Sequence, residues 1–180
     1  MADPHREELS IIFQALSFAA RKHRDQRRKD AEASPYINHP IALADLLINE
    51  GGVSDSRVIC AALLHDTIED TETTPQELEA TFGPDIARLV AEVTDDKALP
   101  KGERKRLQIE HAPHLSQGAK LVKLADKICN LRDVAHSPPA DWPLQRRQAY
   151  FDWARQVVAG VRGVHPRLEA IFDQIFAQRP

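Results

Sequence analysis

The chain has 180 residues, of which 42% are hydrophobic and 28% are charged. Its 24 basic and 27 acidic residues leave a net charge of −3, so no overall charge bias points to nucleic acid or to an acidic partner. The length is that of one ordinary domain with a sizeable hydrophobic core.

The start of the chain, MADPHREELS, does not have the segments of a secretory signal. The longest apolar run, residues 58–64, has seven residues and is too short to span a bilayer. Cys60 and Cys129 both lie in apolar helical patterns, where buried reduced thiols are a better interpretation than a disulfide. We therefore expect a soluble cytoplasmic protein that does not contact a membrane.

Apolar residues recur at spacings of three and four along most of the chain, and no stretch alternates as a half-buried strand does. This pattern predicts an all-α fold in a single domain over residues 1–180. Several prolines are expected in first helical turns, at Pro75, Pro84 and Pro166. The predicted helices cover residues 8–24, 40–50, 56–69, 75–81, 84–95, 103–111, 117–135, 142–161 and 166–177.

Within the predicted helix 56–69, four ionisable side chains follow the apolar run: His65, Asp66, Glu69 and Asp70. On one continuous helix they fall in one sector. A solvated helix end would explain such acids without any ligand. However, crowded carboxylates on a mostly buried helix repel each other and lose solvation, and a divalent cation compensates both effects. Histidine with carboxylates suits manganese, iron or zinc, so the spacing favours a metal site over a solvated helix end.

Two other positions could complete such a site. His39 precedes Pro40, which is expected to open a helix, so the backbone of His39 is expected to be extended. Taken alone, this histidine is better interpreted as a capping or packed residue. Asp126 lies at the edge of the apolar face of helix 117–135, and taken alone it is better interpreted as a salt-bridge partner of Lys123 or Lys127.

Together, the HP pair at 39–40, the HDxxED motif at 65–70 and the KLADK stretch at 123–127 form a specific combination. With them the chain resembles the HD-domain superfamily of metal-dependent phosphohydrolases, and within it the hydrolase half of the RelA/SpoT enzymes. It resembles most closely their small stand-alone forms, the metazoan SpoT homologues and the bacterial small alarmone hydrolases. The resemblance covers nearly the whole chain.

The resemblance implies a helical HD-domain fold that hydrolyses guanosine 3′,5′-bis(diphosphate) (ppGpp) and its pentaphosphate relative with Mn²⁺. It implies that the chain degrades these nucleotides without making them, because the sequence ends after the hydrolase and has no synthetase domain. Water is then the nucleophile, and Glu69 and Asp70 are the implied acid/base pair. The implied metal ligands are His39, His65, Asp66 and Asp126.

A substrate with several phosphates requires cations around it. Matching positions of the family, together with the basic stretch near residue 103, give the substrate-binding candidates Arg28, Lys29, Lys101, Arg104, Asn130, Arg146 and Tyr150. For each basic residue the alternative is a solvated surface charge, and for Lys101 and Arg104 the two interpretations are about equal. Tyr150 could equally be a core aromatic.

Three other functions remain open from the sequence. The same chemistry could act on adenosine analogues of ppGpp and its pentaphosphate relative, or on NADPH as a 2′-phosphatase, because the contacts that select the base are not located. A non-catalytic nucleotide sensor would bind without forming product. The sensor ranks well behind, since all four implied ligands and both acids are present.

Overall fold

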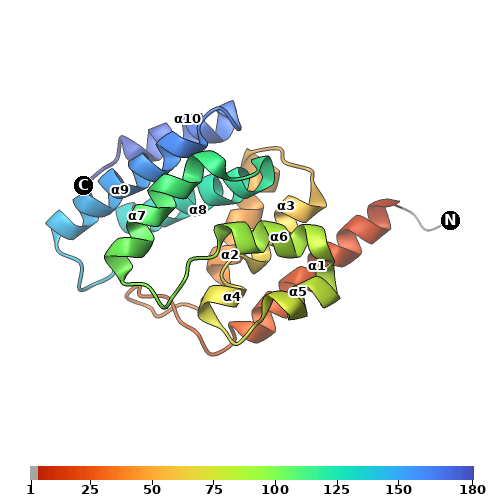
Figure 1. The fold of residues 1–180 in the computed structure, drawn as a ribbon. Helices are drawn as coiled ribbons and strands as arrows, with labels where there is room; N and C mark the ends of the chain where they lie inside the picture. The colour runs from red at the N-terminus through yellow and green to blue at the C-terminus, as the bar shows by residue number, and fades with distance from the viewer. Residues whose placement is uncertain (1–3) are drawn as a thin grey trace.

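Residues 4–180, the part of the chain that the computed structural model describes, fold into helices joined by loops (Figure 1). Within these residues no strand forms, and Arg27 and Pro35 make one isolated antiparallel bridge. The all-α prediction is therefore confirmed. The α-helices are α1 (Pro4–Lys22), α2 (Asn38–Asp45), α3 (Ser56–Leu64), α4 (Thr67–Asp70), α5 (Pro75–Phe82), α6 (Pro84–Val93), α7 (Lys101–His111), α8 (Gln117–His136), α9 (Leu144–Val161) and α10 (Pro166–Phe176).

Local signals in the sequence set several of the helix starts. Pro75, Pro84 and Pro166 lie in the first turns of α5, α6 and α10, as predicted. A proline fits there because the first N–H groups of a helix have no intrahelical acceptor. At the start of α5, the Thr74 hydroxyl also accepts a hydrogen bond from the Glu77 amide at 3.1 Å. These ends are therefore determined within a few residues of sequence.

The predicted continuous helix over 56–69 is wrong, because the chain breaks into α3 and α4 at His65 and Asp66. Asp66 has φ −101° and ψ 0°, outside helical geometry. The Thr67 hydroxyl donates to the Leu64 carbonyl at 2.7 Å, which satisfies a group that the interrupted helix leaves free. Because His65 and Asp66 do not share one continuous helix with Glu69 and Asp70, the helical spacing that placed all four side chains in one sector does not apply to this segment.

The predicted helix over 40–50 also differs from the structure. α2 begins at Asn38, so His39 is helical and the expectation of an extended backbone is wrong. The last turn is a π-helix, η1 (Leu46–Glu50), in which the Gly51 amide donates to the Leu46 carbonyl at 2.8 Å. His39 therefore projects from the first turn of a helix that is buried on one side.

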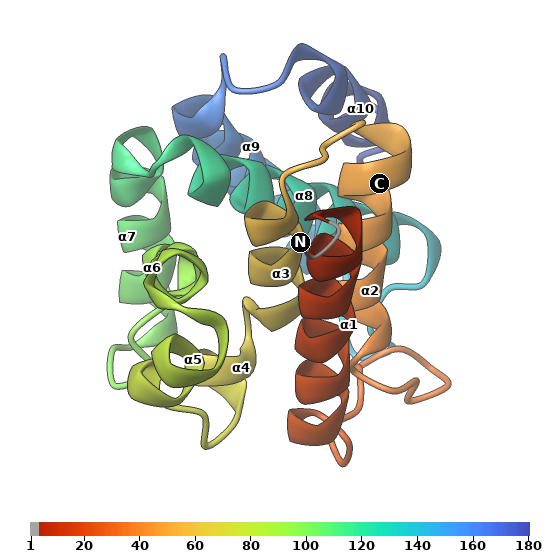
Figure 2. The ribbon, with the colours of Figure 1, turned by 90° about the vertical axis from the view of Figure 1, so that its right-hand side faces the viewer.

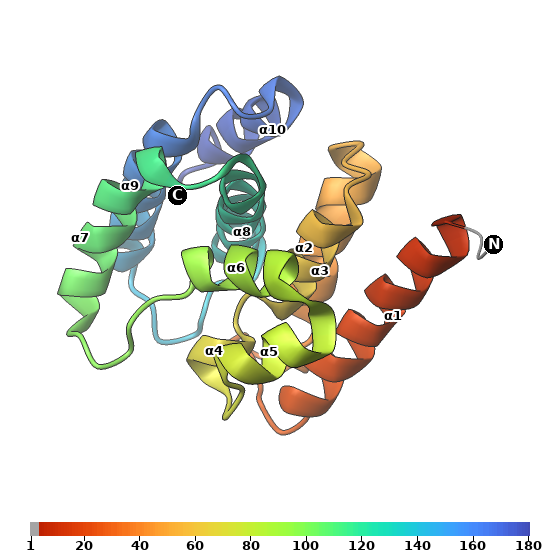
Figure 3. The same cartoon turned by 45° about the vertical axis from the view of Figure 1, so that its right-hand side comes forward.

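α3 and α8 form the centre of the molecule. α3 packs against α1, α2, α6 and α8, and α8 also packs against α9 and α10 (Figures 2 and 3). α7 lies along α9, and a short 3₁₀ helix, η2 (Ala112–His114), joins α7 to α8. All residues of the apolar run in α3 are buried, and Cys60 and Cys129 are buried free thiols, as predicted. No helix in the described chain has the length and apolarity needed to cross a membrane.

Leu43 of α2 is completely buried in this core, whereas Leu9 of α1 is 59% exposed. We expect Leu43→Ala to lower the free energy of unfolding by about 2–5 kcal/mol, because it removes buried methyl groups and leaves a cavity. Leu9→Ala is the matched control and should change it by about 0.5 kcal/mol or less. Urea unfolding followed by circular dichroism measures both, and equal losses would contradict the position of the core.

Candidate functional site

The predicted functional residues converge where α2, the α3–α4 junction, α7, α8 and α9 meet. A cavity of about 260 Å³, here called the inner cavity, lies between these elements. Segments that are up to 117 positions apart in the sequence, from Tyr36 to Trp153, therefore share one surface. Nine of the predicted residues line this cavity: His39, Asp66, Glu69, Asp70, Lys101, Arg104, Asp126, Asn130 and Tyr150.

Two histidines and one aspartate form a cluster beneath this cavity. One ligand atom each from His39, His65 and Asp126 lies within 4.8 Å of the other two, a spacing that can hold a metal ion. His39 Nε2 lies 3.2 Å from Asp126 Oδ1, and His65 Nε2 lies 3.9 Å from the same oxygen. Asp66 Oδ2 is 2.8 Å from His65 Nε2, at the edge of the cluster. The break after α3 thus directs His65 and Asp66 toward α8.

The hydrogen bonding of His65 suits a metal ligand. Its Nδ1 donates to the Ala62 carbonyl at 2.8 Å, so the other ring nitrogen, Nε2, is the one directed into the cluster. Nε2 is buried and has no hydrogen-bond partner in the described residues, because its contact with Asp66 is short but not aligned as a hydrogen bond. An imidazole that is held by one nitrogen and free at the other is the usual state of a metal-binding histidine. The donor set of this cluster therefore fits a divalent metal.

Glu69 lines the inner cavity and is held there by two donors. Arg104 Nη1 lies 3.1 Å from Glu69 Oε1, and the Asp95 amide donates to Oε2 at 3.3 Å. Burial and the nearby carboxylates, that of Asp95 foremost, raise the pKa of Glu69 above its usual value. A raised pKa brings a carboxylate closer to the value that a general base requires near neutral pH.

The neighbouring carboxylates have other partners. Asp70 Oδ2 accepts a hydrogen bond from Gln26 Nε2 at 3.1 Å, and Asp70 also pairs with Lys97. The Tyr36 hydroxyl donates to Asp66. The sequence did not single out Tyr36, which lies in the turn before α2. Tyr36 and Gln26 therefore orient the two aspartates of the HDxxED motif.

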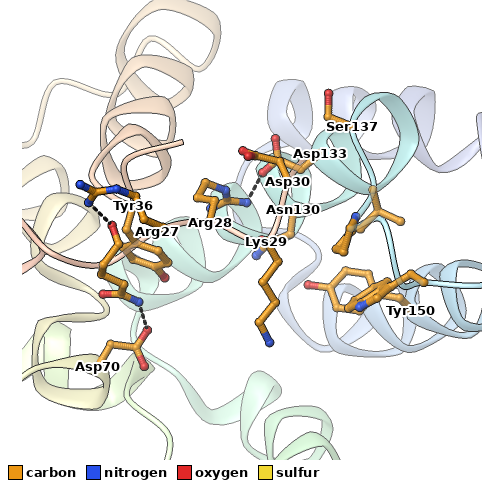
Figure 4. Close-up of a pocket in the computed structure, with 14 residues that line it drawn as sticks. Arg27, Arg28, Lys29, Asp30, Tyr36, Asp70, Asn130, Asp133, Ser137 and Tyr150 are labelled. Atoms are coloured by element: carbon orange, nitrogen blue, oxygen red, sulfur yellow. Dashed lines mark hydrogen bonds and ion pairs between the residues drawn. The ribbon is translucent and has the colours of Figure 1, made fainter. Parts of the chain in front are cut away.

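A second cavity of about 430 Å³, the outer cavity, opens beside the first. Tyr36, Asp70, Asn130 and Tyr150 line both cavities, so the two adjoin. The predicted residues Arg28 and Lys29 line the outer cavity only. In Figure 4, Tyr36 and Tyr150 lie on opposite sides of this pocket and Lys29 extends between them.

Arg28 is already paired at the wall of the outer cavity. Its guanidinium points toward Asp133 of α8 and forms an ion pair with it (Figure 4). The same guanidinium lies over the ring of Tyr36, at 5.9 Å from the ring centroid. Asp133 and Tyr36 are therefore partners of Arg28 that sequence reasoning missed.

Cations gather on the α7 and α9 side of the inner cavity. Burial and neighbouring cations lower the pKa of Lys101 and the pKa of Lys105. Arg146 does not line either cavity; its guanidinium lies 4.4 Å from the Trp142 ring, and its charge contributes to both of these shifts. Cations that repel one another beside a cavity favour an anionic ligand.

A protein-family model described as HD domain matches residues 15–151. The chain belongs to the HD domain family. The match extends from α1 to α9 and includes all four predicted metal ligands of this HD domain. The predicted family and the predicted helical HD-domain fold are therefore confirmed.

Two curated relatives are similar to this chain over almost their whole length. Guanosine-3′,5′-bis(diphosphate) 3′-pyrophosphohydrolase MESH1 of Xenopus tropicalis is 57% identical over 169 residues, which cover 94% of each chain. The Homo sapiens protein of that name is 58% identical over 172 residues, which cover 96% of each chain. A solved structure, described as a metazoan orthologue of SpoT that hydrolyses ppGpp and plays a role in starvation responses, matches with a TM-score of 0.91 and 50% identity. That match covers 94% of this chain and 95% of the other.

The carboxylates around His65 favour a proton on its imidazole in this HD domain, and we predict that metal binding displaces this proton. Burial opposes protonation, but the carboxylates of Asp66 and Asp126 outweigh it and raise the pKa of His65 to about 9. A raised pKa means that the metal-free protein holds this proton at neutral pH, whereas a metal requires the free nitrogen. Titration with Mn²⁺ near pH 8 should therefore release a proton. Calorimetry in two buffers of different ionisation enthalpy measures it, and identical heats would contradict the prediction.

Proposed function

We propose that this chain is a metal-dependent hydrolase of ppGpp and its pentaphosphate relative, and that it forms pyrophosphate with GDP or GTP. The observation that carries the proposal is the cluster of His39, His65 and Asp126, which faces a cavity bounded by acids and by mutually repelling cations. The names of the relatives and of the solved structure support the choice of substrate. The free, buried cysteines support a reducing compartment, and we propose the cytoplasm.

We propose Mn²⁺ as the metal, held by His39, His65, Asp66 and Asp126. A mixture of imidazole and carboxylate ligands suits this ion, and the resemblance to RelA/SpoT hydrolases implies it. When bound, the ion supplies a Lewis acid that makes water a usable nucleophile near neutral pH. Four protein ligands leave positions for water and substrate, which a catalytic site requires.

Glu69 and Asp70 are proposed to manage the protons of the reaction. Water attacks the phosphorus joined to O3′ of the ribose, the bond between that phosphorus and O3′ breaks, and O3′ takes a proton. Glu69 is the proposed acceptor of the water proton, because it is buried and its pKa is raised. Asp70, held by Gln26 and Lys97, is proposed to orient the water.

The cations beside the inner cavity are proposed to hold the phosphates of the substrate. Lys101 and Lys105 line the cavity from α7, and no ion pair with a carboxylate is recorded for either of them among residues 4–180. Arg104 instead pairs with Glu69, so its proposed role is to hold that carboxylate as well as to attract phosphate. Arg146 is proposed to act from outside the cavity by adding to the positive field.

The nucleoside is proposed to occupy the outer cavity. Tyr150 and Asn130 line both cavities and would contact the substrate where the ribose joins its phosphates. Arg28 and Lys29, which line the outer cavity, would lie beside the base and the 5′-diphosphate. A pocket of about 430 Å³ has the size of a small-molecule site.

The function is tested with purified protein, Mn²⁺ and a panel of ppGpp, its adenosine analogue and NADPH, with product analysis. We expect pyrophosphate and GDP from ppGpp, and no turnover after chelation of the metal. Asp126→Ala should abolish turnover and keep the helical circular dichroism, because it removes a ligand at the edge of the core. Binding without product would favour the nucleotide sensor, and preferred turnover of another nucleotide would change the substrate. Full activity of Asp126→Ala would contradict the metal site.

The proposed base can be tested separately from metal binding. Glu69→Gln should lower kcat far more than it weakens Mn²⁺ binding, because it removes a proton acceptor and keeps the shape of the side chain.

The pH dependence of kcat gives a second test of the base. With saturating Mn²⁺, wild-type kcat should fall as pH drops through the raised pKa of Glu69. Asp95→Asn removes the foremost neighbouring charge behind that shift, so the acidic fall in kcat should move to lower pH. An unmoved profile would contradict the role of Glu69 as base.

A further inference from the structure

Two buried lysines on α8 differ in their partners. Lys123 is 9% exposed and donates to the Val93 carbonyl at 3.0 Å. Lys127, one turn later, is 3% exposed, and its Nζ lies 2.9 Å from Asp126 Oδ2. Burying an ammonium group without a partner is strongly unfavourable, so both contacts matter for stability. Only Lys127 directly contacts a proposed metal ligand.

The two oxygens of Asp126 face different surroundings. Oδ1 faces the cluster, where His39 Nε2 lies 3.2 Å away and His65 Nε2 lies 3.9 Å away. Asn130 also donates to Oδ1. On Oδ2, Lys127 is the one donor recorded within residues 4–180. The carboxylate is thus divided between a side that faces the metal position and a side that faces Lys127.

We propose that Lys127 is a positioning residue, which fixes Asp126 so that Oδ1 alone is presented to the metal. This inference rests on the proposed metal site and deepens it. Lys127 does not touch substrate or reacting atoms in this assignment. Its hydrogen bond to Oδ2, together with the Asn130 hydrogen bond to Oδ1, would keep Oδ1 directed toward His39 and His65.

Trp153 of α9 holds Lys127 in this position. The ammonium group of Lys127 lies 4.4 Å from the centroid of the Trp153 ring, a distance typical of a cation–π contact. The indole N–H donates to the Lys105 carbonyl at 3.1 Å, which fixes the ring, and Lys105 Nζ lies 4.6 Å from the same ring. Lys127 is therefore held between the Trp153 ring and Asp126, and it lies against both the cation side and the metal side of the inner cavity.

Removal of Lys127 has two effects of opposite sign on metal affinity. By charge alone, loss of a cation behind Asp126 would tighten binding of a divalent ion. By orientation, loss of the donor on Oδ2 leaves the carboxylate held through Oδ1 alone, by Asn130 and His39, and partners of metal ligands typically contribute about 10- to 100-fold in metal affinity or activity. The proposal requires that orientation dominates.

The experiment measures Mn²⁺ affinity of the purified chain by electron paramagnetic resonance of the free ion, without substrate. The variants are Lys127→Met and the matched control Lys123→Met, which removes a buried lysine from the same helix without touching Asp126. Metal-free thermal unfolding by circular dichroism monitors folding. We expect Lys127→Met to weaken Mn²⁺ binding about 10-fold or more. Lys123→Met should lower stability without weakening Mn²⁺ binding.

Unchanged or tighter binding by Lys127→Met would overturn the proposal, as would an equal loss of affinity in Lys123→Met. If Lys127→Met does not fold, Trp153→Leu provides the test, because it keeps Lys127 and Asp126 and removes the ring that holds the ammonium. Weaker Mn²⁺ binding by this variant supports the proposal, and unchanged affinity overturns it. A wild-type chain that does not bind Mn²⁺ would refute the metal site itself, which distinguishes the two failures.

Discussion

The partly buried carboxylate of Asp126 is the interaction on which the rest of the site depends. An anion that is largely removed from water is stable only when opposite charge or donors surround it, and this one meets His39, Lys127 and Asn130. Each of these partners comes from α8 itself or from a helix packed on it. The packing of α2 and α8 is therefore also what assembles the candidate metal centre.

The site separates two kinds of charge. Carboxylates and imidazoles lie on the side of α2, α4 and α8, whereas Lys101 and Lys105 lie on α7 and approach from the other side of the inner cavity. Arg104 and Lys127 cross this division by pairing with Glu69 and Asp126. A polyphosphate that also contacts a metal needs both sides at once, so this separation supports a phosphorylated nucleotide as the substrate.

The helix pattern, the prolines in first turns and the buried cysteines could all be predicted, because each depends on neighbours within a few residues. The motif residues could also be selected, since HDxxED with HP and KLADK is a specific combination. The break at His65 could not be predicted, because no glycine or proline marks it. Thr67 satisfies the Leu64 carbonyl there, and Asp66 leaves the helical region, which places its carboxylate 2.8 Å from His65 Nε2.

By itself, the sequence determined the helical fold class, the HD domain resemblance and the residues with chemistry in their side chains. Only the tertiary structure decided which of them meet: it brought His39 to Asp126 across 87 positions, paired Arg28 with Asp133, and left Arg146 outside both cavities. The physical reason is the separation along the chain over which each kind of interaction acts. Helix formation and capping are local, whereas the environment of a buried charge depends on side chains that approach from distant segments, and their approach is set by the packing of the whole core.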